Sequence, residues 1–206
     1  VGLNWIDSAS RPKDAPFLLF LHYMDPHDPN PDPDRPGKGF ARVQMPNPDP
    51  EKWLQPMIKA YAADIEYMDA YIGRLMDGLK QRGLYDDTLI VFTADHGEEF
   101  QEHKGWWHGL SLYDEQIKIP LMMKLPRNAA KGTYVSDLAR HVDIAPTLAK
   151  FAGLPVSPKW QGQPLLKDDF ASNNGGIGFV HSHLDFEGIK LKSLRSMDKK
   201  YIEANE

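Results

Sequence analysis

The chain has 206 residues and a net charge of −5, and 41% of its residues are hydrophobic. This composition supports one large folded domain, or one domain with a small addition, and excludes a disordered chain. The absence of cysteine excludes disulfides and thiolate metal sites. No cluster of basic residues predicts a nucleic-acid partner, and no apolar run approaches the roughly 20 residues of a membrane-spanning helix.

The first half of the chain predicts a strand, a helix and a second strand. Residues 16–24 contain the apolar run FLLFL, which is typical of a buried strand. Residues 25–50 contain eight prolines, which disfavour regular structure and indicate either a linker or a functional lid. Apolar residues recur every three or four positions over residues 55–79, which predicts a long helix ended by Gly83. Residues 88–93 form the next expected strand, parallel to the first.

The second half continues with a short helix over residues 111–118, a strand over 119–125 and a helix over 143–152. Beyond residue 155 three short segments, 177–181, 190–195 and 201–204, are separated by glycine or charged turns, which predicts an antiparallel sheet. The expected fold class is therefore α/β. A mostly parallel sheet flanked by helices occupies residues 1–155, and a small C-terminal antiparallel appendage occupies residues 156–206.

The segment DHGEEFQEHKGWWH, residues 95–108, contains three histidines and four carboxylates. Parallel strands bring their carboxyl ends to one edge of a sheet, where ligands usually bind. His27 follows the first expected strand, and Asp95 and His96 follow the second, so we expect them at the same edge. A carboxylate beside an imidazole suits a divalent metal, although Asp95 could instead cap a helix and leave His96 exposed.

The other charged residues of this segment allow several roles. His103 and His108 are candidate ligands, acid–base groups or surface histidines, because histidine is the side chain that most readily exchanges a proton near neutral pH. Glu98, Glu99 and Glu102 are interpreted as one solvated turn of a helix.

Two other patterns could be mistaken for sites. His181, His183 and Asp185 alternate along one expected strand face, which is typical of a polar surface and only rarely of a metal site. The segment SASRP, residues 8–12, offers serine hydroxyls beside an arginine but precedes the first strand, at the wrong edge of the sheet.

Four segments, taken in order, resemble the sulfatase family of the alkaline-phosphatase superfamily. They are PFLLFLHYMDPHDP (16–29), YAADIEYMDAYIGRLMDGLKQRGLYDDTLIVFTADHGEE (61–99), EHKGWWHGLSLYDEQIKIPLMM (102–123) and DIAPTLAKFAGLP (143–155). The segment QGQPLL (161–166) follows in family order. LKSLRSMDKKYI (191–202) resembles the hairpin that opens the family's C-terminal subdomain.

This resemblance implies roles for five residues. Asp95 and His96 match the family's pair of metal ligands. His27 matches a histidine that contacts the sulfate group. His108 lies where many members place a lysine or histidine against the sulfate and the leaving oxygen, so His27 and His108 are the implied catalytic residues. His103 matches a recurrent histidine on the substrate side.

The resemblance also implies a sulfuric ester hydrolase that acts on an anionic small-molecule or glycan sulfate ester. The implied metal is Ca²⁺, or Mn²⁺ or Zn²⁺ in a phosphohydrolase, and the nucleophile is formylglycine made from an upstream Cys or Ser. No segment here matches that nucleophile motif. We therefore expect the chain to lack the N-terminal half that is its partner in the same polypeptide, and to be inactive alone.

Several alternatives remain open at this level. A phosphonate monoester hydrolase or a phosphodiester hydrolase of the same superfamily shares the DHG segment, and a non-catalytic binding module is a third interpretation. The sequence is also compatible with a homo-oligomer, and with either a cytoplasmic or an extracytoplasmic location.

Overall fold

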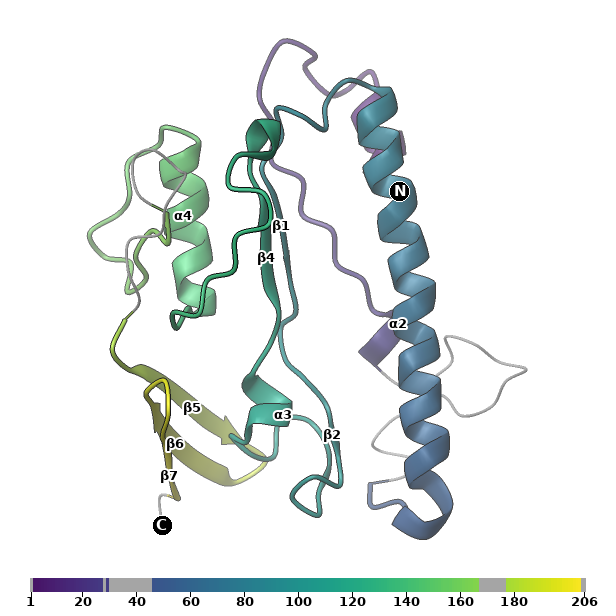
Figure 1. Ribbon diagram of the computed structural model, residues 1–206, viewed down its shortest axis with the longest axis vertical. Coiled ribbons are helices and arrows are strands. Elements are labelled where there is room, and N and C mark those ends of the chain that lie inside the picture. The colour runs from purple at the N-terminus through teal and green to yellow at the C-terminus, as the bar shows by residue number, and fades with distance from the viewer. Residues whose placement is uncertain (1, 28, 30–45, 167–176, 205–206) are drawn as a thin grey trace. The chain divides into compact units, whose positions relative to one another are not determined.

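The computed structural model describes residues 2–27, 29, 46–166 and 177–204 (Figure 1). The chain forms two compact units, of which the first contains Val1–Asp86 and Phe100–Trp106, and the second contains Asp87–Glu99 and Trp107–Glu206. The domain boundary predicted between residues 155 and 156 lies within the second unit and stays a prediction. No described helix is long and apolar enough to cross a bilayer.

The first unit is built on one long helix, α2 (Pro50–Gln81). The Asp49 side chain caps its first turn by accepting a hydrogen bond from the Glu51 amide at 3.1 Å. At its other end Gly83 adopts a φ of +64°, and the Leu84 amide donates to the Leu79 carbonyl at 3.0 Å. This closure is a Schellman motif, so the predicted helix and its glycine stop are confirmed.

A short helix, α1 (Gly2–Asp7), packs on α2. A Cβ atom at Gly78 would lie 2.5 Å from Leu3 Cδ1, so the two helices approach closely at this glycine. The Arg82 guanidinium holds the pair together, because its Nε donates to Asp7 Oδ1 at 2.7 Å.

The strand predicted over residues 16–24 is wrong, because these residues belong to none of the described strands. Their side chains still alternate between half-buried and exposed positions, and the Leu18 and Phe20 residues are 77% and 82% exposed. The period of two is that of a strand, but a strand also needs a neighbouring ladder for its amides and carbonyls. The segment leads into the 3-10 helix η1 (Asp25–His27). Most of the proline-rich loop that follows lies outside the described residues.

The second unit contains the pair of strands β1 (Ile90–Thr93) and β4 (Leu121–Lys124). They are antiparallel, with Ile90 opposite Lys124 and Thr93 opposite Leu121. The chain contains both helices and strands, and the α/β class is confirmed. Every strand register determined in the described residues is antiparallel. The predicted parallel pairing is not observed there, because residues 16–24 form no strand.

Short elements connect β1 to β4. The strands β2 (Glu99–Phe100) and β3 (Trp106–Trp107) form a two-stranded sheet, and α3 (Asp114–Ile117) is the predicted short helix. A 3-10 turn, η2 (Pro126–Asn128), follows β4.

The helix predicted over residues 143–152 is α4 (Ile144–Phe151), preceded by the 3-10 turn η3 (His141–Asp143). Gly153 has a φ of +70° and ends it as predicted. The Asp143 carboxylate binds the Arg140 guanidinium, and its Oδ1 accepts from the Gln163 amide at 2.9 Å. Residues 161–166 are thereby fixed to the start of α4.

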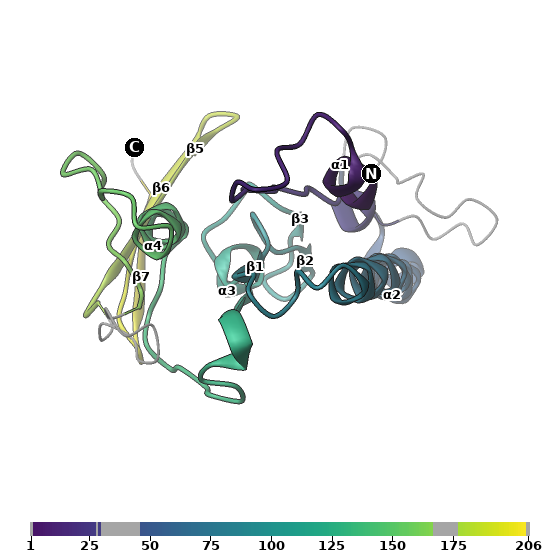
Figure 2. The same ribbon diagram turned by 90° about the horizontal axis from the view of Figure 1, so that it is seen from above.

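The predicted C-terminal antiparallel sheet is confirmed as β5 (Val180–Phe186), β6 (Ile189–Arg195) and β7 (Lys200–Ala204), in that order (Figure 2). His181, His183 and Asp185 lie on its exposed face, as the polar-surface interpretation requires.

Candidate active site

Strand β1 delivers Asp95 and His96 directly after its end, as the sequence predicts. The Thr93 hydroxyl closes the strand pair by donating to the Pro120 carbonyl at 2.9 Å. The next element after Asp95 is the strand β2 rather than a helix, so the alternative in which Asp95 caps a helix is excluded. The Asp95 side chain is 69% exposed and therefore accessible to a ligand.

His96 is held in one tautomer by its own backbone. Its Nδ1 lies 2.7 Å from the Gly97 carbonyl oxygen, which can only accept a hydrogen bond. The proton is therefore on Nδ1 and the lone pair on Nε2. This Nε2 lies 3.9 Å from Asp95 Oδ1, a spacing that allows the two atoms to bind one cation. The pair thus fits a divalent metal.

Gly97 is the residue that allows the turn after His96. Its amide donates to the Gln116 carbonyl at 2.8 Å. A Cβ atom at this position would lie 2.0 Å from the Glu115 carbonyl oxygen, so only glycine fits.

His108 lies against His96 in the same unit. The two rings stack, with their centroids 3.8 Å apart and their planes 23° from parallel. His108 Nδ1 lies 3.1 Å and 3.3 Å from the two oxygens of the Glu98 carboxylate. The Glu98 side chain is only 3% exposed, so this contact is made almost out of water.

The interpretation of Glu98 and Glu99 as part of a solvated helical turn is wrong. Both residues are buried, and Glu99 begins β2. Burial follows from partners that are distant in the sequence, because Glu98 faces His108 and Glu99 accepts from Gln116 Nε2 at 2.7 Å. Glu102 is exposed as expected, and it accepts from the Phe100 amide.

Gln116, which organises the loop around the site, was not identified from the sequence. This residue is 1% exposed. Its Oε1 accepts from the amides of Leu110 and Ser111 at 3.2 Å and 3.1 Å, while its Nε2 binds Glu99. Together with its carbonyl, which holds Gly97, these bonds fix the segments that carry His96 and His108.

Two more residues beside the site were not predicted. His141 Nε2 donates to the Ala94 carbonyl at 2.6 Å and so fixes the backbone next to Asp95. Trp107, which precedes His108, is buried and has a φ of +70°. This left-handed conformation is uncommon for a bulky residue and is a form of strain that often occurs at functional sites.

The remaining predicted residues belong to the first unit. His27 is the last residue of η1, is half-buried, and donates its amide to the Met24 carbonyl at 3.1 Å. His103 is exposed in the turn between β2 and β3, which the Gln101 amide closes by donating to the Gly105 carbonyl. The second unit therefore brings together Asp95, His96 and His108.

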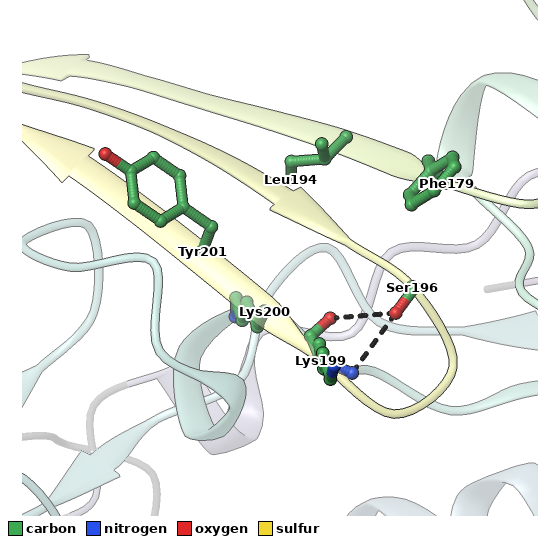
Figure 3. Close-up of a pocket in the computed structure, with 6 residues that line it drawn as sticks. All are labelled: Phe179, Leu194, Ser196, Lys199, Lys200 and Tyr201. Atoms are coloured by element: carbon green, nitrogen blue, oxygen red, sulfur yellow. Dashed lines mark hydrogen bonds between the residues drawn. The ribbon is translucent and has the colours of Figure 1, made fainter.

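The cavity drawn in Figure 3 is separate from these residues. It has a volume of about 300 Å³ and lies on the sheet of β5, β6 and β7, lined by Phe179, Leu194, Ser196, Lys199, Lys200 and Tyr201. Figure 3 shows the Ser196 hydroxyl bonded to the backbone of Lys199 beside it. None of the predicted site residues lines this cavity.

The fold and the residues after β1 define an α/β protein of the alkaline-phosphatase-like class with a candidate metal-ligand pair. The chain belongs to the sulfatase family, because the family model named Sulfatase matches residues 2–154.

Curated sulfatases are among its relatives. The chain is 35% identical over 118 residues to N-acetylglucosamine-6-O-sulfatase of Bacteroides thetaiotaomicron, which covers 56% of this chain and 21% of the relative. It is 27% identical over 249 residues to arylsulfatase K of Bos taurus, which covers 98% of this chain and 45% of the relative. The chain thus spans less than half the length of these relatives.

A solved structure shares the fold and part of the sequence. It is that of BT4656 in complex with its substrate D-glucosamine-2-N,6-O-disulfate, with a TM-score of 0.64 and 29% identity. The match covers 72% of this chain and 32% of the other. Family membership indicates a metal cofactor in the complete protein.

Proposed function

We propose that the complete protein is a sulfatase that hydrolyses sulfate esters, and that this chain supplies part of its metal and sulfate site. The observation that carries the proposal is the cluster of Asp95, His96 and His108 directly after β1. Membership of the sulfatase family supports it.

Each proposed residue has a distinct task. Asp95 and His96 Nε2 hold the cation, which neutralises negative charge on the sulfate oxygens when it is bound. His108 presents its Nε2 to the sulfate group and the leaving oxygen, where a proton or a hydrogen bond stabilises the charge that develops as the ester bond breaks. We assign His27 to sulfate binding, and His103 to the substrate side.

For the cofactors we propose Ca²⁺ as the metal and formylglycine as the nucleophile. One carboxylate and one imidazole also accept Mn²⁺ or Zn²⁺, so the choice of Ca²⁺ rests on the resemblance to sulfatases. The sequence contains no cysteine. A formylglycine made from cysteine would therefore come from another part of the polypeptide.

The proposed substrate class is a sulfated glycan. Support comes from a relative named N-acetylglucosamine-6-O-sulfatase and from the disulfated glucosamine bound in the similar structure. We expect 6-O-sulfated glucosamine to be a better substrate than an unsubstituted aryl sulfate, because contacts to the sugar add binding energy in the transition state.

The experiment is a turnover assay on the purified complete protein with three substrates, an aryl sulfate, an aryl phosphodiester and a 6-O-sulfated glucosamine. We expect release of sulfate from the first and third at rates well above that of phosphodiester cleavage. A kcat/KM that is higher for the phosphodiester would make the protein a phosphohydrolase. Activity on none of the three substrates would favour a binding module.

A further inference from the structure

We infer that Glu98 is a positioning residue for His108, holding its imidazole in one orientation and presenting Nε2 to the substrate. The inference deepens the proposed function and rests on it for the catalytic role of His108. The geometry of Glu98 itself does not depend on that role.

The contact between the two side chains is directional. Both carboxylate oxygens of Glu98 lie within hydrogen-bond distance of the same ring atom, His108 Nδ1, at 3.1 Å and 3.3 Å. A carboxylate accepts and does not donate, so the proton of a neutral His108 is on Nδ1 and its lone pair on Nε2. Free imidazole side chains exchange their proton between the two nitrogens, and this contact selects one arrangement.

The Glu98 side chain is itself held in place. The residue before it, Gly97, donates its amide to the Gln116 carbonyl at 2.8 Å, and the residue after it, Glu99, binds Gln116 Nε2 at 2.7 Å. Bonds on both sides therefore fix the backbone that carries Glu98. Burying a carboxylate is costly unless it is paired, so the burial of Glu98 also favours the bond to His108.

One face of the His108 ring is restricted as well. The His96 ring stacks on it with a centroid separation of 3.8 Å, which limits the tilt that His108 can adopt. The carboxylate fixes the rotation within the ring plane, and the stacked ring fixes the plane. A ring held by both has its Nε2 aimed in one direction. This atom accepts a proton when the ring is neutral and can donate it to the leaving oxygen once both nitrogens are protonated.

The test compares Glu98→Met with Glu98→Gln in the complete protein. Met keeps the volume of the side chain and removes the acceptor, whereas Gln keeps an oxygen that can accept from Nδ1. The matched control is Glu66→Met, which makes the same substitution at an exposed position of α2 and leaves Glu98, Gln116 and the bond to His108 intact.

The first readout is the tautomer of His108, from long-range proton–nitrogen NMR spectra at a pH where the ring is neutral. We expect Nδ1–H in the wild type, in Glu98→Gln and in the control, and a shift to Nε2–H in Glu98→Met. An unchanged tautomer in Glu98→Met would overturn the inference. This readout needs no turnover, so it tests Glu98 even if the protein is not a sulfatase.

The second readout is the split between kcat and KM. We expect Glu98→Met to lower kcat by about 10- to 100-fold with little change in KM, and Glu98→Gln to recover most of the loss. A purely structural role would lower the melting temperature of both variants without this recovery, which would contradict the inference. Full activity in His108→Ala would instead refute the proposed function of His108.

Discussion

Asp95 is the residue whose role can be tested most directly, since its carboxylate faces solvent 3.9 Å from His96 Nε2. We expect Asp95→Ala in the complete protein to lose its bound metal, because removing one ligand leaves the cation under-coordinated. Elemental analysis of the purified variant measures the loss. Asp185→Ala, on the exposed face of β5, is the control that keeps its metal. Stoichiometric metal in Asp95→Ala would refute the assignment.

His27 and His108 are the two residues to which we assign contact with the sulfate group. We expect either change to alanine to lower kcat/KM by at least about tenfold, which corresponds to about 1.4 kcal/mol of lost transition-state stabilisation. Steady-state kinetics of the complete protein give the value, with exposed His183→Ala as the control. If both variants turn over sulfate esters like the wild type, the two histidines have no role in the reaction.

The sequence could predict individual residues only where the local pattern contains the information. Asp95 and His96 follow an apolar β-branched run, so their position at the end of a strand could be predicted. The burial of Glu98 could not be predicted, because its partner, His108, lies ten residues further along the chain. A run of acidic residues is usually solvated, and only the tertiary partners reverse that expectation here.

Among the elements, the four-residue helix α3 contributes most to holding the loop around the site. Its Gln116 satisfies Glu99 and the amides of Leu110 and Ser111 in a buried position. We expect Gln116→Ala to lower the free energy of unfolding by about 3 kcal/mol, because several buried polar groups lose their partner. Denaturant unfolding measures the change.

The control for that experiment is Gln55→Ala on the exposed side of α2. Its effect should stay within about 0.5 kcal/mol, as for other surface substitutions. If both changes cost the same, Gln116 is not the residue that holds the loop.

Elements stabilised by local interactions were predicted well, and those that depend on a partner were not. The helices α2 and α4 have apolar periodicity and glycine stops, and both were located correctly. Residues 16–24 have equally clear strand periodicity and form no strand in the described residues, because hydrogen bonding to a neighbour cannot be read from one segment. For the same reason the sequence did not indicate that β1 and β4 run antiparallel.

At the scale of the whole molecule, ionic contacts connect distant parts of the second unit. Asp114 of α3 binds Arg195 of β6 and Lys200 of β7, at 2.7 Å and 2.8 Å. Asp143 binds Arg140 and the Gln163 amide, which joins η3 to residues 161–166. Because α3 also holds Gly97, the C-terminal sheet is linked to the loop that carries Asp95 and His96.

The Asp143 contacts make stability depend on pH. Burial raises the pKa of this carboxyl, but the hydrogen bonds from Arg140 and the Gln163 amide outweigh it and hold the pKa below the ordinary value of 3.8. A lowered folded-state pKa adds stability that is present above the unfolded-state pKa and is lost as the pH falls through the folded-state pKa. We therefore expect a loss of stability in the acid range below the ordinary value.

Thermal unfolding of the wild type and of Asp143→Asn across the acid range checks this expectation. The variant should be less stable near neutral pH by about 1.5–3 kcal/mol, since Arg140, whose side chain is 26% exposed, then loses its charged hydrogen-bond partner. It should also lose less stability on acidification, because the titrating carboxyl is gone. Parallel pH profiles for the two proteins would mean that Asp143 is not the titrating group.

The bond from the Gly97 amide to the Gln116 carbonyl has a consequence for how the protein can be observed. This amide should exchange its hydrogen with solvent only when the loop opens, so its exchange rate reports the local opening free energy. A cation that binds Asp95 and His96 in the closed loop must slow this exchange further, in proportion to its affinity. A single backbone proton therefore gives a titratable signal for metal binding that requires neither a substrate nor a catalytic cycle.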